Sequence, residues 1–281
     1  MLTTTDHSRD SAGLTYVYPV ISRRSGGLSI GINLNPNNAC NWRCIYCQVP
    51  NLVRGSSPEI DLQQLKNELD GFLKDVVHGD FYDRYDVAED LRTIRDIALS
   101  GNGESTSAEK FDQIVLLIGQ LIRQFHLQNK IKLILITNGS LVDKKVVQAG
   151  LSSMSTINGE VWFKLDSATD VGLKTINHAG LSIERVKQNL KIVSALCPTW
   201  LQTCVFKFDG ELPEKNEREA YLQFLSWTKE EELEIEGVLL YGLARPSMQP
   251  EAPRLSNYSE EWMNDFADEI RALEFQVKVN P

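Results

Sequence analysis

Short apolar runs alternate with amphipathic helical patterns along most of this 281-residue chain, and this alternation restricts the fold more than any other feature. Six runs, each followed by a helical pattern, have the length and composition of strands: residues 28–34, 93–100, 132–137, 161–166, 199–206 and 236–243. A seventh run, 275–280, would close the chain. Strands separated by helices favour a parallel sheet. We therefore expect an α/β fold, an open parallel (β/α)6 partial barrel, with its chemistry at the carboxyl ends of the strands.

The helical patterns between these strands have core-facing stripes. One stripe consists of Leu62, Leu65, Leu69, Phe72, Leu73 and Val76, and another of Ile114, Leu117, Ile118, Leu121, Ile122 and Phe125. Thr106 and Glu109 have the spacing of a capping box, which would start the second of these helices. Further helices are predicted over 182–196, 216–229 and 259–273.

The composition of the chain and its polar N-terminal segment bear on its domain organisation, location and partners. Residues 1–13 are polar, and we expect a disordered arm there, followed by a single domain over 14–281. There is no apolar run of roughly 18 residues, so no transmembrane helix is expected. The absence of a signal-peptide pattern favours the cytoplasm. A net charge of −9 disfavours a broad surface for nucleic acid.

Three of the five cysteines lie within eight residues, directly after the first predicted strand. Cys40, Cys44 and Cys47 follow a Cys-x3-Cys-x2-Cys spacing. Three thiolates could hold three irons of a cubane and leave the fourth iron without a protein ligand. The alternatives are a structural zinc site, for which the sequence shows no second pair of ligands, and unligated thiols.

The cysteine spacing, with Tyr46 before the last cysteine, resembles the signature of the radical S-adenosylmethionine (AdoMet) superfamily. Segments 22–32, 137–139 and 241–246 resemble the branch of wyosine-base synthases and related Fe–S oxidoreductases, and the match runs from about Pro19 to the last helix. That resemblance implies a partial barrel of the radical AdoMet type, with a 4Fe–4S cluster and AdoMet as cofactors. The wyosine-base synthases carry a second cluster, whose cysteines are missing here because none precedes Cys40.

The resemblance also implies the reaction. AdoMet would chelate the open iron, and the reduced cluster would break its C5′–S bond to give a 5′-deoxyadenosyl radical that abstracts hydrogen from a substrate. Segment 100–104, Ser-Gly-Asn-Gly-Glu, is similar to the family's GGEP stretch, with Ser105 in place of the proline. An ordinary strand-to-helix turn would explain these glycines equally well, as an ordinary Asn-Gly turn would explain Asn138 and Gly139.

Strand alternation supplies further candidates. Trp162, Lys164 and Asp166 share the polar face of their strand and would line the barrel, unless Lys164 and Asp166 simply pair with each other. Gln202 and Cys204 would face inward in the same way. The candidates for binding AdoMet are Tyr46, Ser100, Gly101, Asn102, Gly103, Glu104, Thr137, Asn138, Lys164, Asp166 and Gln202.

Four residues are candidates for contact with the substrate. Cys204 is a possible hydrogen donor, although it and Cys197 also fit buried structural cysteines. Arg245 follows the strand of Tyr241 and could clamp a carboxylate or phosphate, if it is not simply solvated. Arg23 and Arg24 could likewise contact an anionic group of the substrate, or simply be solvated. The four scattered histidines have no metal-ligand spacing to one another.

The predicted function is an enzyme that modifies a small molecule or peptide by radical chemistry, with a reductant such as flavodoxin or ferredoxin as partner. An RNA-modifying enzyme and a glycyl-radical activase are alternatives. A metal-stabilised binding scaffold is the non-enzyme alternative. Neither nucleic acid nor a membrane is an expected partner.

Overall fold

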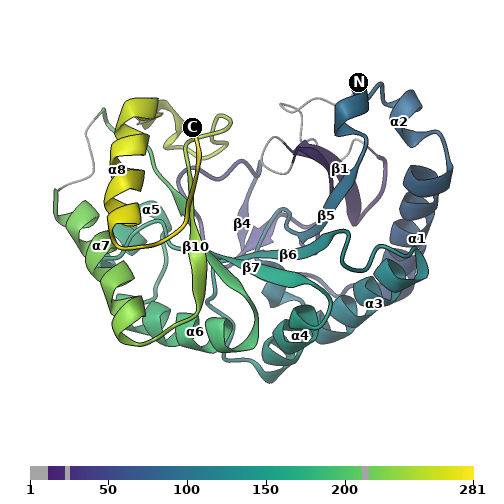
Figure 1. The fold of residues 1–281 in the computed structure, drawn as a ribbon, viewed down its shortest axis with the longest axis horizontal. Coiled ribbons are helices and arrows are strands. Elements are labelled where there is room, and N and C mark those ends of the chain that lie inside the picture. Colours follow the sequence, from purple (N-terminus) through teal and green to yellow (C-terminus); the bar gives the residue numbers. More distant parts are fainter. Residues whose placement is uncertain (1–11, 23–25, 211–214) are drawn as a thin grey trace.

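The computed structural model describes residues 12–22, 26–210 and 215–281 and shows a curled sheet with helices along its outer side (Figure 1). The eight strands lie in the order β1-β2-β5-β6-β7-β8-β10-β12. Their bounds are Val17–Ser22 (β1), Gly27–Ile32 (β2), Ile94–Leu99 (β5), Lys132–Thr137 (β6), Gly159–Lys164 (β7), Thr199–Cys204 (β8), Ile235–Tyr241 (β10) and Val277–Asn280 (β12). All neighbours from β2 to β12 pair in parallel.

Helices connect successive parallel strands across the convex side of the sheet (Figure 1). They are α1 (Leu62–His78), α2 (Phe81–Arg84), α3 (Phe111–Gln124), α4 (Lys145–Ser155), α5 (Asp170–Ile176), α6 (Ile183–Leu196), α7 (Lys215–Glu230) and α8 (Glu260–Ala272). Six strands from β2 to β10 are each followed by helix, and β12 closes the sheet. The predicted open parallel (β/α)6 partial barrel is thereby confirmed.

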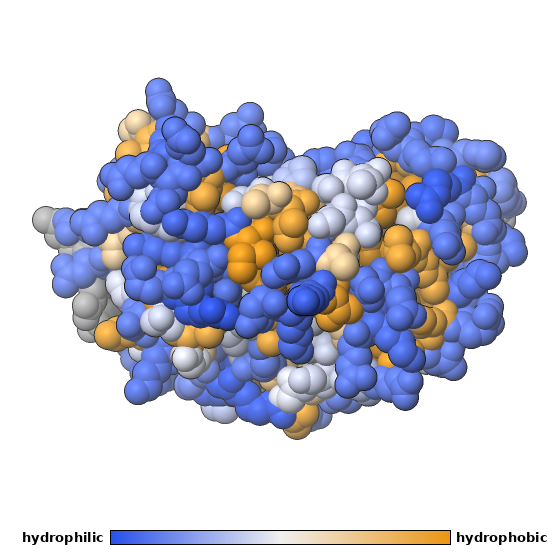
Figure 2. All heavy atoms as spheres, turned by 90° about the horizontal axis from the view of Figure 1, so that it is seen from below, coloured by the Kyte–Doolittle hydropathy of each residue, from blue (hydrophilic) through white to orange (hydrophobic). Residues whose placement is uncertain are grey.

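The core lies between the sheet and these helices. Val161, Phe163 and Leu165 alternate along β7 and just beyond it, and all three are fully buried. The stripe of α1 supplies Leu65, Leu69 and Leu73 to the same core. Each such side chain contributes about 1.5–3 kcal/mol on burial. The opposite faces of the helices are polar, and the view from below shows a mostly hydrophilic surface with scattered apolar side chains (Figure 2).

Several local elements differ from the sequence predictions. The prediction of a capping box at Thr106 is wrong, because α3 begins only at Phe111. Thr106 lies instead in a 3-10 turn, η2 (Ser105–Ser107), and its hydroxyl donates to Glu104 at 2.6 Å. β1 was not predicted. It contains Pro19 and pairs antiparallel with β2 at the edge of the sheet, where a residue without N–H is tolerated. α4 and α5 were not predicted either.

Candidate active site

The loop between β2 and α1 carries the three clustered cysteines. Within it, β3 (Ala39–Cys40) pairs in parallel with β4 (Val53–Arg54). The end of α5 accepts two backbone hydrogen bonds from the loop, from Ile45 N to Ile176 O at 2.8 Å and from Arg43 N to Asn177 O at 3.1 Å. After β10, Met248 N donates to Cys47 O at 2.9 Å. Two segments distant in sequence therefore hold this loop across the carboxyl ends of the strands.

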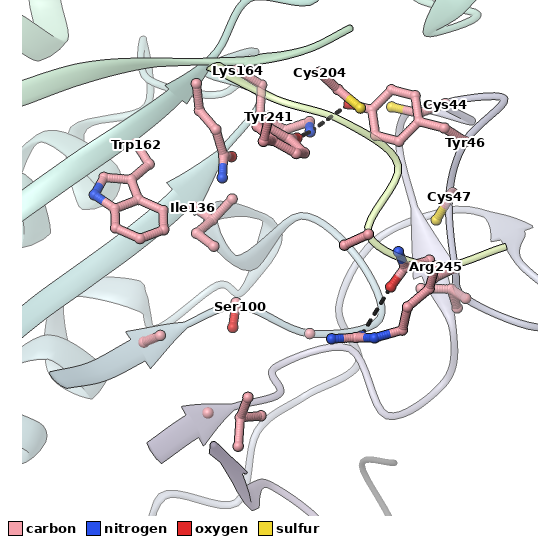
Figure 3. A pocket seen from close by; sticks show the side chains of 18 of the residues that line it. Cys44, Tyr46, Cys47, Ser100, Ile136, Trp162, Lys164, Cys204, Tyr241 and Arg245 are labelled. Carbon is pink, nitrogen blue, oxygen red and sulfur yellow. Dashed lines mark hydrogen bonds between the residues drawn. The ribbon is translucent and has the colours of Figure 1, made fainter. Parts of the chain in front are cut away.

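All three cysteines line one cavity of about 580 Å³ inside the barrel. In Figure 3, Cys44, Tyr46 and Cys47 lie on one side of this cavity and Trp162 and Ile136 on the other. Eleven other predicted site residues form part of its wall: Tyr46, Ser100, Gly101, Asn102, Gly103, Glu104, Asn138, Lys164, Gln202, Cys204 and Arg245. The structure thus brings together residues at the carboxyl ends of five strands and in the cysteine loop.

The segment Ser100–Glu104 packs directly against the cysteine loop. A Cβ on Gly103 would overlap the carbonyl oxygen of Ala39, and a Cβ on Gly101 would overlap the side chain of Asn33. Neither glycine has a positive φ, so close packing rather than backbone conformation requires a residue without a side chain. The two glycines let the end of β5 approach the cysteine loop.

Glu104 links this segment to the end of β6. Its carboxylate is almost completely buried and accepts from Thr137 Oγ1 at 2.6 Å and from Asn138 N at 2.8 Å. Thr137 is directed at Glu104 and does not line the cavity. Asn138 Nδ2 donates onward to Asn41 Oδ1 at 2.9 Å, in the cysteine loop. Glu104 therefore holds the ends of two strands in register with the loop.

Lys164, Tyr46 and Asp166 form a buried polar cluster. Lys164 Nζ donates to Tyr46 Oη at 2.6 Å, Tyr46 Oη donates to Asp166 Oδ2 at 2.5 Å, and Lys164 lies 3.9 Å from Asp166. Lys164 reaches the cavity, whereas the side chain of Asp166 is fully covered and lies behind the wall. Desolvation lowers the pKa of Lys164, but the Asp166 carboxylate raises it and the net shift is upward. Lys164 therefore presents a positive charge to the cavity.

Gln202 and Arg245 contribute polar groups at other positions of the wall. Gln202 is 3% exposed, and its Oε1 has no hydrogen-bond partner among the described residues. A buried acceptor in this condition is unfavourable unless a ligand satisfies it. Arg245 Nη1 donates to Gln48 Oε1 at 3.1 Å, just after Cys47 (Figure 3).

Several candidates lie elsewhere. Cys197 is buried away from the cavity, and its thiol donates to Gly159 O at 3.6 Å. Arg23 and Arg24 lie outside the described residues. Two residues that sequence reasoning did not identify belong to the site: Asn41, which bonds Asn138, and Asn177, whose amide lies 3.2 Å from Cys44 Sγ. Asn41 follows Cys40 directly, whereas no pattern in the sequence marks Asn177.

The residues present fit an iron–sulfur cluster and AdoMet. The three thiols of the cysteine loop line a cavity of the size that binds small ligands, and the unsatisfied Gln202 oxygen suits the amino or hydroxyl groups of AdoMet. In the described part of the chain, no three Cys, His, Asp or Glu side chains are grouped so as to hold one metal ion. A cubane does not require such a group, because each thiolate binds a different iron.

A family model described as the radical SAM superfamily matches residues 34–215. The chain therefore belongs to the radical SAM superfamily and is a radical SAM enzyme, whose cofactors are a 4Fe–4S cluster and AdoMet. The matched range includes the cysteine loop and the strands from β5 to β8.

Solved structures of radical SAM enzymes share the fold. TYW1 with a lysine-pyruvate adduct bound is 14% identical, with a TM-score of 0.57 and coverage of 87% of this chain and 73% of that one. A radical SAM methyltransferase from Sphaerobacter thermophilus is 14% identical, with a TM-score of 0.52 and coverage of 90% of this chain and 66% of that one. Methylornithine synthase (PylB) is 11% identical, with a TM-score of 0.51 and coverage of 89% of this chain and 63% of that one. At these identities the likeness shows the fold alone.

A curated relative matches only part of the chain. A GTPase Obg from Brachyspira hyodysenteriae is 29% identical over 133 residues, which are 47% of this chain and 17% of that protein. The chain thus spans a small part of the relative's length. Separately, no helix among the described residues is both long and apolar enough to cross a membrane.

Proposed function

We propose that this chain cleaves AdoMet reductively and uses the resulting radical to abstract hydrogen from a small molecule or a peptide. Cys40, Cys44 and Cys47 would hold the cluster. The observation that carries this proposal is the shared cavity: the three thiols and the polar groups at the strand ends line the same cavity. When bound, the reduced cluster and AdoMet supply one-electron cleavage of the C5′–S bond and a carbon radical.

The chain's own groups would bind and orient AdoMet. Lys164 would attract a carboxylate, and Tyr46 fixes its ammonium by accepting one of its hydrogens. Gln202 would accept from an amino or hydroxyl group. Asn138 and the backbone of Ser100–Glu104 lie on the wall near the cysteine loop and would contact the part of AdoMet closest to the cluster.

The apolar part of the wall would protect a radical from water. Ile134, Ile136 and Trp162 line the cavity, and Figure 3 shows Ile136 and Trp162 on the side opposite Cys44 and Cys47. Excluding water from a reactive intermediate suppresses side reactions. Cys204 and Arg245 lie on the same wall, where Cys204 would donate hydrogen and Arg245 would bind an anionic substrate group.

A lysine adduct, as named for the TYW1 structure, is not the role that we propose for Lys164. Among the described residues, Lys164 is the one lysine that lines the cavity. Adduct formation needs a neutral amine, whereas the Asp166 carboxylate keeps the pKa of Lys164 above its ordinary value although desolvation lowers it. Binding of a carboxylate uses the charged form that this environment favours.

The test is an anaerobic reaction of the cluster-loaded chain with AdoMet and dithionite. We expect 5′-deoxyadenosine and methionine, and none from a variant lacking the three cysteines. With candidate substrates, deuterium incorporated from labelled substrate into 5′-deoxyadenosine would identify the hydrogen donor. A fully loaded chain that binds AdoMet but never yields 5′-deoxyadenosine under reduction would refute the proposal.

A further inference from the structure

The amide of Asn177 lies between Cys44 and the buried carboxylate of Asp166. Its Nδ2 is 3.2 Å from Cys44 Sγ and 2.7 Å from Asp166 Oδ2. We propose that Asn177 is a positioning residue that donates a hydrogen bond to the Cys44 sulfur and thereby raises the reduction potential of the cluster. This inference rests on the proposed function, in which Cys44 is a cluster ligand.

The orientation of the amide follows from its neighbours. An amide NH2 has two hydrogens, and both a carboxylate and a thiolate accept hydrogen bonds. One hydrogen is directed to Asp166 and the other to Cys44. The flipped amide would place its oxygen against two acceptors. Oδ1 has no partner among the described residues, although Asn177 is fully buried.

The backbone fixes Asn177 relative to the sulfur. The carbonyl of Asn177 accepts from Arg43 N at 3.1 Å and that of Ile176 accepts from Ile45 N at 2.8 Å, on either side of Cys44. These two hydrogen bonds therefore join the loop to the end of α5 on both sides of Cys44.

Asp166 is fixed as well, because its carboxylate accepts from Cys204 N at 3.0 Å and from Tyr46 Oη at 2.5 Å. The hydrogen bond to Cys44 thus connects two rigid groups, and little ordering is needed to form it.

Reduction adds negative charge to the cluster and its thiolates. A donor directed at a ligating sulfur stabilises the reduced form more than the oxidised form, and hydrogen bonds to sulfur are among the factors that set cluster potentials. The donor is shielded from water, because Asn177 is fully buried, and a hydrogen bond is electrostatically stronger in such a low-dielectric environment. Loss of the donor should lower the potential.

The experiment compares three variants with the wild-type chain, each loaded with its cluster and titrated anaerobically while the signal of the reduced cluster is followed by electron paramagnetic resonance. Asn177→Leu removes the donor at similar volume. Asn177→Ala also lacks the N–H group and adds no charge beside Cys44. The matched control is Asn189→Leu: Asn189 is equally buried, donates to Gly139 O at 3.0 Å and has an unpartnered Oδ1, but hydrogen-bonds no cysteine.

We expect Asn177→Leu to reduce the equilibrium constant for reduction about tenfold, which is about 59 mV for a one-electron couple. Asn189→Leu should keep the wild-type potential. An unchanged or higher potential in Asn177→Leu would overturn the inference and leave the proposed function intact. Failure of the wild-type chain to bind four irons would instead overturn the proposed function.

If Asn177→Leu does not hold a cluster, Asn177→Ala decides in the same way: a lower potential supports the inference and an unchanged or higher one contradicts it. Loss of the cluster from both variants, with normal loading of Asn189→Leu, also contradicts it. Asn177 would then be required for assembly of the cluster rather than for its potential.

Discussion

Replacement of Asp166 by asparagine should mainly destabilise the fold and affect AdoMet binding much less. The Asp166 side chain is fully buried behind the cavity wall, with Lys164 3.9 Å away. Its two oxygens accept from Tyr46 Oη, Asn177 Nδ2 and Cys204 N. An asparagine has one acceptor oxygen, so at least one of these donors would face an NH2 group. Lys164 would also lose its counter-charge.

The magnitude follows from the burial of the ion pair. Removing one partner of a buried pair costs about 3–5 kcal/mol. For a domain of this size each kcal/mol shifts the melting temperature by about 2–4 °C, which predicts a decrease of roughly 6–20 °C. The matched control is Asp170→Asn, because Asp170 is exposed and accepts from Ile183 N at 2.6 Å, a bond that asparagine can retain. That variant should change stability by about 0.5 kcal/mol or less.

Thermal melting and AdoMet titration of both variants give the answer. We expect a large decrease in melting temperature for Asp166→Asn, with near-normal affinity per folded molecule. Unchanged melting together with weakened AdoMet binding would refute this reasoning and give Asp166 a direct role in the site.

Three further predictions concern the cysteine loop and nucleic acid. Gly103→Ala should destabilise the chain by about 1–3 kcal/mol and lower its iron content, because the added Cβ overlaps a backbone oxygen of the loop; normal iron content and an unchanged melt would contradict this. Glu251 accepts two hydrogen bonds from Arg43, at 2.7 and 2.8 Å, and these lower the pKa of its carboxyl; desolvation raises that pKa, but the net shift is downward. Glu251→Gln should therefore lose roughly 1 kcal/mol at neutral pH. In denaturant titrations the difference should vanish as acid protonates Glu251, and a difference that persists in acid would argue against the ion pair. Finally, filter binding should detect no submicromolar tRNA complex; one that weakens about a thousandfold between roughly 50 and 200 mM salt would favour the RNA-modifying alternative.

The fold was predictable because its strands are marked by local composition. β6, Lys132–Thr137, is an apolar run with polar neighbours, and its observed bounds agree with the prediction. β1 was missed because Pro19 argues against a strand, and only its position at the sheet edge makes the proline acceptable. α5 was missed because seven residues are too few to establish a helical period.

The candidate site was predictable only in part. The cysteine spacing is local, and strand alternation is a local rule that placed Lys164 and Gln202 on the inner face of the barrel, where both line the cavity. The contact between Asn177 and Cys44 joins residues 133 positions apart, and it depends on how α5 packs against the loop. The structural role of Glu104 could not be predicted from the sequence either, because its carboxylate accepts a hydrogen bond from Asn138, 34 residues away. Such contacts arise from tertiary packing, which a local pattern does not encode.

The central claim is that Cys40, Cys44 and Cys47 alone hold a catalytic 4Fe–4S cluster. Iron and acid-labile sulfide analysis of anaerobically purified chain tests it most directly, with alanine at all three positions and, as control, at the buried Cys197. The wild-type chain and Cys197→Ala should each bind about four irons and four sulfides per chain, and the triple variant none. Four irons in the triple variant, or zinc without sulfide in the wild-type chain, would contradict the account.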